Sequence, residues 1–366
     1  MPPPSGGFVY ASEYDSLQAA ADFAFGKVES PHGITDVTNN KTLIIDEPRR
    51  IWTPPSLGVP VLDLRHLCSG RIVGTGRLST KLRQNVAGVP VVRTNGCGYS
   101  HFEGFECEGS PESVVFDLNW DGTAGGAALQ SNTFVDLLFL NGNYGTNIGA
   151  GGFMGSENTF LNCYWQSNVR AALVCSNYNA LQQQIFGGNV QNCGIGFWAT
   201  VGSIPIIHGV GFQLSKECDI RTDGNPANTM SIVGCRTESK NFILNHGGHR
   251  LDVSACTQTY PGNEKGYLLY QSGGQAVVRV CKSNNGNVLA KFWANIRVEN
   301  SEFIREDWLE AHQPWWIPNN NVAAVVEAHN VFAGNTHILA RRYEALPNGT
   351  DFPTLGKISD YAMVQL

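Results

Sequence analysis

The feature that most constrains this chain is a strand-like repeat between about residues 101 and 303. Eight segments align on one position each: Cys107, Leu137, Cys163, Gly188, Val210, Cys235, Cys256 and Cys281. The steps between these positions are 30, 26, 25, 22, 25, 21 and 25 residues, and the segments show alternation rather than a helical pattern. Repeats of this length are typical of a β-solenoid, in which each repeat forms one coil and stacks on the next.

The alternation predicts which side chains fill the coil, because successive side chains of a strand point to opposite faces. Counting by twos from the aligned position gives a strongly apolar interior: Phe105, Cys107, Val135, Leu137, Phe139, Leu161, Cys163, Trp165, Phe186, Val190, Val210, Phe212, Val233 and Cys235. The same count places His208 inside, as a core residue. Ser254 and Arg279 do not follow the pattern, so we expect a bulge or a one-residue shift near them.

Composition and charge narrow the class of protein. The 366 residues include 41 glycines and only 15% charged residues, which suits short strands joined by tight turns. A net charge of -6 disfavours nucleic-acid binding. No apolar run is long enough for a membrane-spanning helix, so we expect no membrane insertion. At least four of the ten cysteines fall in the inward column, which predicts buried free thiols rather than disulfides.

The two ends of the repeat have different characters. Residues 1–13 read as a flexible lead that lacks the features of a signal peptide. Asp15 and Gln18 occupy the positions of a capping box, and helical apolar spacing follows them. We therefore predict a short helix that covers the open end of a β-helix domain over residues 14–340, with a C-terminal tail or cap over 341–366.

A resemblance to a known superfamily rests on three stretches in this order. They are DSLQAAADFAF at the start, TLIID next, and then RIVGTGRLSTKLR, followed by the repeated coils. This succession resembles the pectate-lyase superfamily of right-handed parallel β-helices, which includes polysaccharide-active enzymes and phage tailspike-like proteins. The resemblance covers most of the chain, from about Asp15 to about residue 340. It implies an all-β fold, a single right-handed parallel β-helix with an N-terminal capping helix, and no specific subfamily.

The predicted outer face carries the strongest candidate site. Glu106, Asp136 and Asn162 are expected at one outward position on three successive coils. Strands of neighbouring coils lie about 4.8 Å apart, so Glu106 and Asp136 would hold their carboxyl groups roughly 5 Å apart. That separation suits a retaining glycosidase, and the crowding would raise one pKa and provide an acid. An outer face is polar in any case, so the same residues also suit an ordinary solvated surface.

Further residues complete this candidate site. The flanking positions are predicted to bind substrate: Glu108, Asn162, Tyr164, Asn189 and Arg236. A second candidate lies in the loops at one edge of the coils, where Asp121, Asp219 and Asp223 are found. Asp219 and Asp223 would line a cleft there together with Arg221. No spacing of His, Cys, Asp or Glu predicts a metal site, and no fingerprint predicts a cofactor.

Three functions remain open at this point. The first is a carbohydrate-active enzyme that cleaves glycosidic bonds of a polysaccharide, with Glu106 and Asp136 as the acid and the nucleophile or base. The second is a polysaccharide lyase, which would use Tyr164 or a Lys/Arg as a base and a cation or Arg236 to neutralise a uronate. The third is a non-catalytic phage tailspike or adhesin that binds glycan, for which a homotrimer and an extracellular or virion-associated location are expected.

Overall fold

The computed structural model describes most of the chain. The described residues are 7–29, 35–37, 41–65, 67–120, 130–149, 155–224, 229–262, 264, 266–284, 286–291, 294–303, 309–312, 324–328, 330–332, 335–340 and 361–365. The chain divides into two compact units. Unit 1 comprises residues 1–194 and 202–204, and unit 2 comprises residues 195–201 and 205–366.

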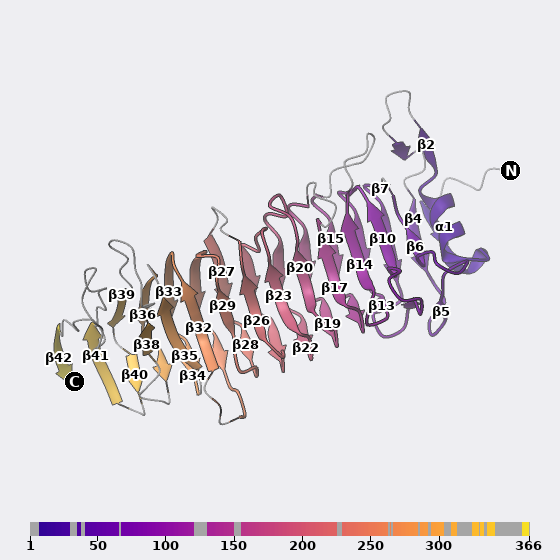
Figure 1. The fold of residues 1–366 in the computed structure, drawn as a ribbon. Helices are drawn as coiled ribbons and strands as arrows, with labels where there is room; N and C mark the ends of the chain where they lie inside the picture. The colour runs from indigo at the N-terminus through magenta and orange to yellow at the C-terminus, as the bar shows by residue number, and fades with distance from the viewer. Residues whose placement is uncertain are drawn as a thin grey trace. The chain divides into compact units, whose positions relative to one another are not determined.

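Unit 1 contains three parallel sheets (Figure 1). The first sheet is formed by β1 (Phe8–Tyr10), β4 (Thr42–Ile45), β8 (Arg71–Gly74), β12 (His101–Glu103), β15 (Thr133–Val135), β18 (Thr159–Leu161) and β21 (Gln184–Phe186). The second is formed by β5 (Ile51–Trp52), β9 (Lys81–Arg83), β13 (Glu106–Glu108), β16 (Leu138–Leu140), β19 (Tyr164–Gln166) and β22 (Asn189–Gln191). The third is formed by β6 (Leu62–Asp63), β10 (Val92–Asn95), β14 (Val114–Asn119), β17 (Tyr144–Ile148) and β20 (Ala171–Cys175). Each coil contributes one strand to each sheet.

Smaller elements complete unit 1. The 3-10 helix Ala11–Glu13 follows β1, β7 (Leu67–Cys68) pairs with β11 (Cys97–Gly98), and β2 (Lys27–Glu29) pairs antiparallel with β3 (Thr35–Val37).

Unit 2 repeats the three-sheet pattern. The strands of its first sheet are β24 (Ile206–His208), β27 (Thr229–Val233), β30 (Arg250–Ser254), β33 (Gln275–Arg279), β36 (Asn295–Glu299) and β39 (Ala324–Ala328). The second contains β25 (Gly211–Gln213), β28 (Arg236–Thr237), β31 (Thr257–Gln258), β34 (Lys282–Ser283), β37 (Glu302–Phe303) and β40 (Asn330–Phe332), to which β41 (Asn335–Ala340) and β42 (Tyr361–Gln365) add antiparallel. The third contains β23 (Ile195–Ala199), β26 (Cys218–Thr222), β29 (Ile243–Asn245), β32 (Gly266–Ser272), β35 (Gly286–Lys291) and β38 (Leu309–His312).

The helix α1 (Leu17–Ala24) covers the N-terminal end of unit 1 (Figure 1). Its buried face consists of Leu17, Ala20, Ala21 and Ala24. The helix begins after Ser16, whose hydroxyl accepts a hydrogen bond from the Ala19 amide at 3.1 Å, so Ser16 rather than Asp15 is the N-cap. These observations confirm the all-β, right-handed parallel β-helix with a capping helix. The predicted domain boundaries stay a prediction.

Stacked side chains fill the interior of unit 1. Phe102, Phe134 and Phe160 stand on neighbouring strands of the first sheet, with ring centroids 5.1 and 4.6 Å apart and nearly parallel rings. Beside them the buried amides of Asn132 and Asn158 continue the stacking, because Asn132 Nδ2 donates to Asn158 Oδ1 at 2.9 Å. All ten cysteines are free, as predicted, and nine of them are buried.

A column of left-handed residues marks the bend between the first and second sheets. In unit 1 it contains Gly104, Asp136, Asn162 and Gly187, and in unit 2 it contains Gly209, Gly234, Ala255, Val280 and Asn300. Their φ angles lie between 47° and 70°. Such a residue changes the direction of the chain, so the alternation does not continue across it.

This bend corrects the predicted inner and outer faces. The inward residues before it are Phe134, Phe160, Ile185, Ile207, Ile232, Val253 and Val278. Four apolar residues predicted inside are instead half-exposed on the outer face of the first sheet, namely Val135, Leu161, Phe186 and Val233. His208 was also predicted inside and is exposed. Ser254 and Arg279 also lie on the outer face of the first sheet, because Ser254 pairs with Val233 and Arg279 pairs with Ser254.

Candidate functional site

The register of the second sheet corrects the predicted carboxylate pair. Glu106 on β13 lies opposite Leu138 on β16, not opposite Asp136. Asp136 belongs to the bend, with φ of 49°, and its column neighbour in the preceding coil is Gly104. The residue equivalent to the other aligned positions is therefore Phe105 rather than Cys107, because Leu138 N donates to the Phe105 carbonyl at 3.1 Å. The prediction that Glu106 and Asp136 lie side by side was wrong, because the residue opposite Glu106 is two positions further along the chain than Asp136.

The observed register creates a strip on the outside of unit 1. Lys81, Glu106, Leu138, Tyr164 and Asn189 occupy one position on five successive strands. The residues that follow them in sequence are buried in the coil, so these five belong to the opposite, outer face. We call these five residues the outer strip. At about 4.8 Å per strand it extends over roughly 19 Å.

Glu106 lies deep within this strip. Its side chain is only 6% exposed, and its Oε1 atom contacts Lys81 Nζ at 2.7 Å. A carboxylate removed from water in this way requires a nearby cation, and Lys81 on the preceding strand provides it. Glu106 is thus a partner in an ion pair rather than an openly accessible carboxylate.

Glu108 is held beside the strip by several donors. The Arg83 guanidinium donates to its Oε2 atom at 2.7 Å, Lys81 Nζ lies 3.5 Å away, and Asn141 Nδ2 donates to Oε1 at 3.3 Å. Burial would raise the pKa of Glu108. The hydrogen bond and charge of Arg83, together with Lys81 and Asn141, outweigh burial and hold this pKa below its ordinary value. Glu108 is therefore an ionised, positioned acceptor.

Asp136 organises a second group at the bend. Arg77 donates to its Oδ1 atom at 2.8 Å, and Asn162 Nδ2 donates to the same oxygen at 3.3 Å. The Arg77 guanidinium also lies 3.5 Å from the centre of the Tyr164 ring, a cation–π contact. Arg77 thus links the bend to the strip and lies against one face of Tyr164.

The remaining predicted binding residues divide between the units. Asn189 lies opposite Tyr164, and its Oδ1 atom is buried with no hydrogen-bond partner among the described residues. Arg236 belongs to unit 2, where its side chain is 67% exposed and pairs with Glu238 at 3.0 Å. Glu106, Glu108, Asp136, Asn162, Tyr164 and Asn189 therefore share one surface of unit 1.

Sequence reasoning missed the cations of this surface. Arg77, Lys81 and Arg83 come from the stretch GTGRLSTKLR, which lies before the residues used to align the repeat. Three cations within seven residues were visible there. Only the pairing of β9 with β13 shows that Lys81 and Arg83 face Glu106 and Glu108.

The second predicted site is not assembled as expected. Asp121 lies outside the described residues. Asp219 is fully buried within unit 2, where the Thr237 hydroxyl donates to its carboxylate, so it does not line a cleft with Asp223. Asp223 is exposed and accepts two hydrogen bonds from Arg221 Nε at 3.0 Å and one from Trp198 Nε1 at 2.7 Å. Asp219 was predicted to lie in a loop. Asp219 instead lies within the strand β26, between the buried residues Cys218 and Ile220.

The described part of the chain has neither a membrane-spanning helix nor a cluster of metal-binding side chains. None of its helices has the length and apolar character needed to cross a membrane. No group of three or more His, Cys, Asp or Glu residues there is arranged to hold a metal ion.

No family model and no curated protein matches this chain. Among solved structures, the chain is similar to a protein described as Geobacillus virus E2 - ORF18, with a TM-score of 0.42 and 10% sequence identity. The match covers 92% of this chain and 66% of that one, just under two thirds of its length. The fold is established by the parallel pairing of the strands of this chain.

Proposed function

We propose that this chain binds a polysaccharide along the outer strip of unit 1. The parallel β-helix is compatible with polysaccharide-active enzymes and with glycan-binding proteins. The observation that carries the proposal is the register of Lys81, Glu106, Leu138, Tyr164 and Asn189 across five adjacent strands. A repeating row of side chains along a solenoid suits a ligand that is itself a linear repeat.

The charges of this surface favour a neutral glycan. Glu106 pairs with Lys81, Glu108 with Arg83, and Asp136 with Arg77. Three cations balance three carboxylates, so no excess charge remains to attract a polyanion. Hydroxyl groups both donate and accept hydrogen bonds, so a neutral sugar can bind such paired groups without disturbing the charge balance.

Binding is better supported than cleavage. A two-carboxylate mechanism needs an acid and a second carboxylate on either side of one glycosidic bond. Here Glu106 and Asp136 are offset by two residues in register, and each contacts its own cation. Their catalytic roles stay a prediction from the sequence, as do the lyase alternative, the homotrimer and the virion-associated location.

The test is binding to a panel of neutral and uronate polysaccharides, measured by affinity electrophoresis with a reducing-end assay on the same mixtures. We expect retention by at least one neutral polysaccharide and at least a fivefold weaker affinity in Asn189→Ala and Tyr164→Ala. Gln184→Ala is the matched control, because Gln184 lies on the outer face of the first sheet of the same unit.

Three results would count against this function. Undiminished retention in both strip variants would remove the outer strip as the binding surface. New reducing ends that disappear in Glu106→Gln and Asp136→Asn would replace a binding protein with the predicted glycosidase. An unsaturated uronate, detected by its ultraviolet absorbance, would instead indicate the lyase.

A further inference from the structure

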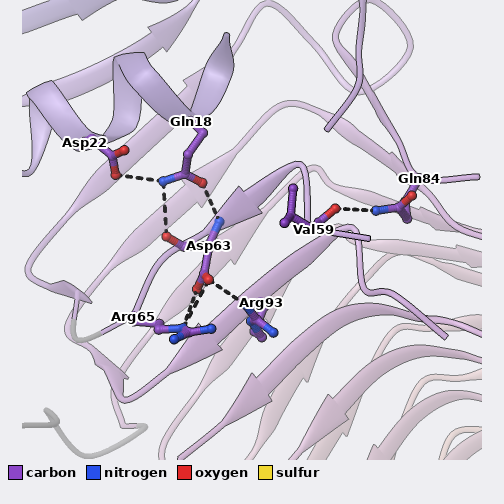
Figure 2. A network of polar contacts seen from close by, with 7 residues as sticks. All are labelled: Gln18, Asp22, Val59, Asp63, Arg65, Gln84 and Arg93. Atoms are coloured by element: carbon purple, nitrogen blue, oxygen red, sulfur yellow. Dashed lines mark hydrogen bonds and ion pairs between the residues drawn. The ribbon is translucent and has the colours of Figure 1, made fainter. Parts of the chain in front are cut away.

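A cavity of about 500 Å³ lies at the N-terminal end of unit 1. Its walls come from the helix α1, the loop that precedes β6, and the strands β6 and β10 of the third sheet. Figure 2 shows polar contacts around this cavity, among them the one by which Gln18 of the helix reaches Asp63 of β6. This volume is within the range of small-molecule sites in proteins.

The walls of this cavity are fixed by hydrogen bonds. Gln18 Oε1 accepts from the Asp63 amide at 2.7 Å, and Gln18 Nε2 donates to Asp22 Oδ1 at 2.8 Å. The loop on the other side is held because the buried Gln84 donates to the Val59 carbonyl at 2.7 Å (Figure 2). The cavity is therefore preformed, which lowers the entropic cost of binding a ligand.

Polar groups of both kinds face the cavity. Asp63 accepts from Arg65 Nε at 3.1 Å and from an Arg93 terminal nitrogen at 2.6 Å. These bonds use only part of each guanidinium, so Arg65 and Arg93 keep further N–H groups that can donate. Asp22 at the rim is exposed and supplies further acceptor capacity.

The charges in this region also balance. The lining has two cations, Arg65 and Arg93, and two carboxylates, Asp22 and Asp63. Asp117 on β14 lies opposite Arg93 in the sheet. Burial raises the pKa of Asp117 to about 6, although the charge of Arg93 opposes the rise. No cationic surplus is left for an anionic ligand, so the site favours a neutral one.

The rest of the lining is apolar. Pro55, Val59 and Pro60 contribute to one wall, and the exposed hydroxyl of Ser56 lies among them. A pyranose ring has an apolar C–H face and a rim of hydroxyls that donate and accept. An apolar wall opposite paired charged groups is complementary to that combination.

We propose that this cavity binds one neutral pyranose residue, with its hydroxyls on Asp22, Arg65 and Arg93 and its C–H face on the proline wall. The site is separate from the outer strip, since it lies against the third sheet and the helix. It takes a single sugar residue rather than a length of chain. The inference does not depend on the outer strip, and each can fail alone.

The experiment is a titration of the full chain with methyl glycosides of glucose, galactose and mannose, followed by saturation-transfer NMR, with glucuronate as the charged comparison. We expect millimolar binding of at least one neutral glycoside and weaker binding of glucuronate. Asp22→Ala and Arg65→Ala should each weaken binding at least fivefold, and Ser56→Trp should abolish it by filling the cavity. All three side chains are exposed, so the variants should fold, which circular dichroism would check.

Matched controls separate the two sites. Arg71→Ala removes another exposed guanidinium of unit 1, paired with Glu103 outside the cavity, and should leave glycoside binding unchanged. Asn189→Ala should also have no effect on it. Tighter binding of glucuronate than of the neutral glycosides would overturn the ligand class. Absence of binding, or binding that survives Ser56→Trp, would overturn the site.

Discussion

Asp219 shows how one buried carboxylate can control stability. Burial raises its pKa from 3.8 to about 7, although the hydrogen bond from the Thr237 hydroxyl and the nearby hydroxyls of Ser215 and Ser239 oppose the rise. The folded state thus binds the proton more tightly than the unfolded state does. Its contribution favours folding at low pH, and that advantage is lost as the pH rises from about 4 to about 7.

We therefore predict that Asp219→Asn changes the pH dependence of unfolding. A neutral amide avoids the cost of a buried charge, so the variant should gain stability relative to the natural chain as the pH is raised. The relative gain between pH 4 and pH 8 is about 4 kcal/mol at most. Thermal and urea unfolding across this range would measure it, with the exposed Asp223→Asn as control. Parallel curves for Asp219→Asn and the natural chain would show that Asp219 does not titrate as described.

The candidate site was predictable only in part from single residues. Glu106, Glu108, Asp136, Asn162, Tyr164 and Asn189 were identified as outward residues, and they do share one surface. Their partners were not identified, because an ion pair such as Lys81–Glu106 joins residues 25 positions apart and depends on the register of two strands. A shift of two residues in that register changes which carboxylates meet.

The bends between strands explain most errors at the scale of elements. Glycine, asparagine and aspartate favour the left-handed conformation, and Gly104, Asp136, Asn162 and Gly187 form the column in unit 1. That composition was a signal in the sequence. Ala255 and Val280 of unit 2 adopt the same conformation without belonging to these residue types, so local preference alone does not locate every bend.

Two adjacent glycines allow a matched test of this bend. Gly187 and Gly188 both have positive φ, 65° and 84°. A Cβ on Gly187 would meet nothing closer than 4.0 Å, whereas a Cβ on Gly188 would lie 1.9 Å from the Cys163 carbonyl oxygen of the neighbouring coil. We predict that Gly187→Ala costs about 1 kcal/mol from backbone strain alone.

Gly188→Ala should cost several times more, because the two coils must separate to relieve the clash. Urea unfolding of both variants, followed by circular dichroism, measures the difference. Similar midpoints for the two would mean that the coils can move apart easily and that close stacking at Gly188 is not required.

At the scale of the whole molecule, the sequence predicted the architecture better than the site. The repeat length depends on how many residues complete one coil, and a one- or two-residue error in alignment leaves it unchanged. The prediction of which residues face outward does change with such an error. Val135, Leu161 and Phe186 were predicted inside and face outward. The fold can therefore be predicted from the repeat length alone, whereas the outer surface requires the exact alignment of the repeats.

The reactivity of the free thiols measures how tightly the interior of the protein is packed. All ten cysteines are free, and only Cys68 is partly accessible, while burial raises the pKa of Cys163 to about 12. Buried, protonated thiols react slowly, since the thiolate is the nucleophile. Ellman's reagent should therefore label about one thiol in the folded protein and ten after denaturation, and a reductant should not shift the melting temperature. Rapid labelling of several thiols in the folded state would mean that the stacked coils open readily, because packing between coils is what separates these sulfur atoms from solvent.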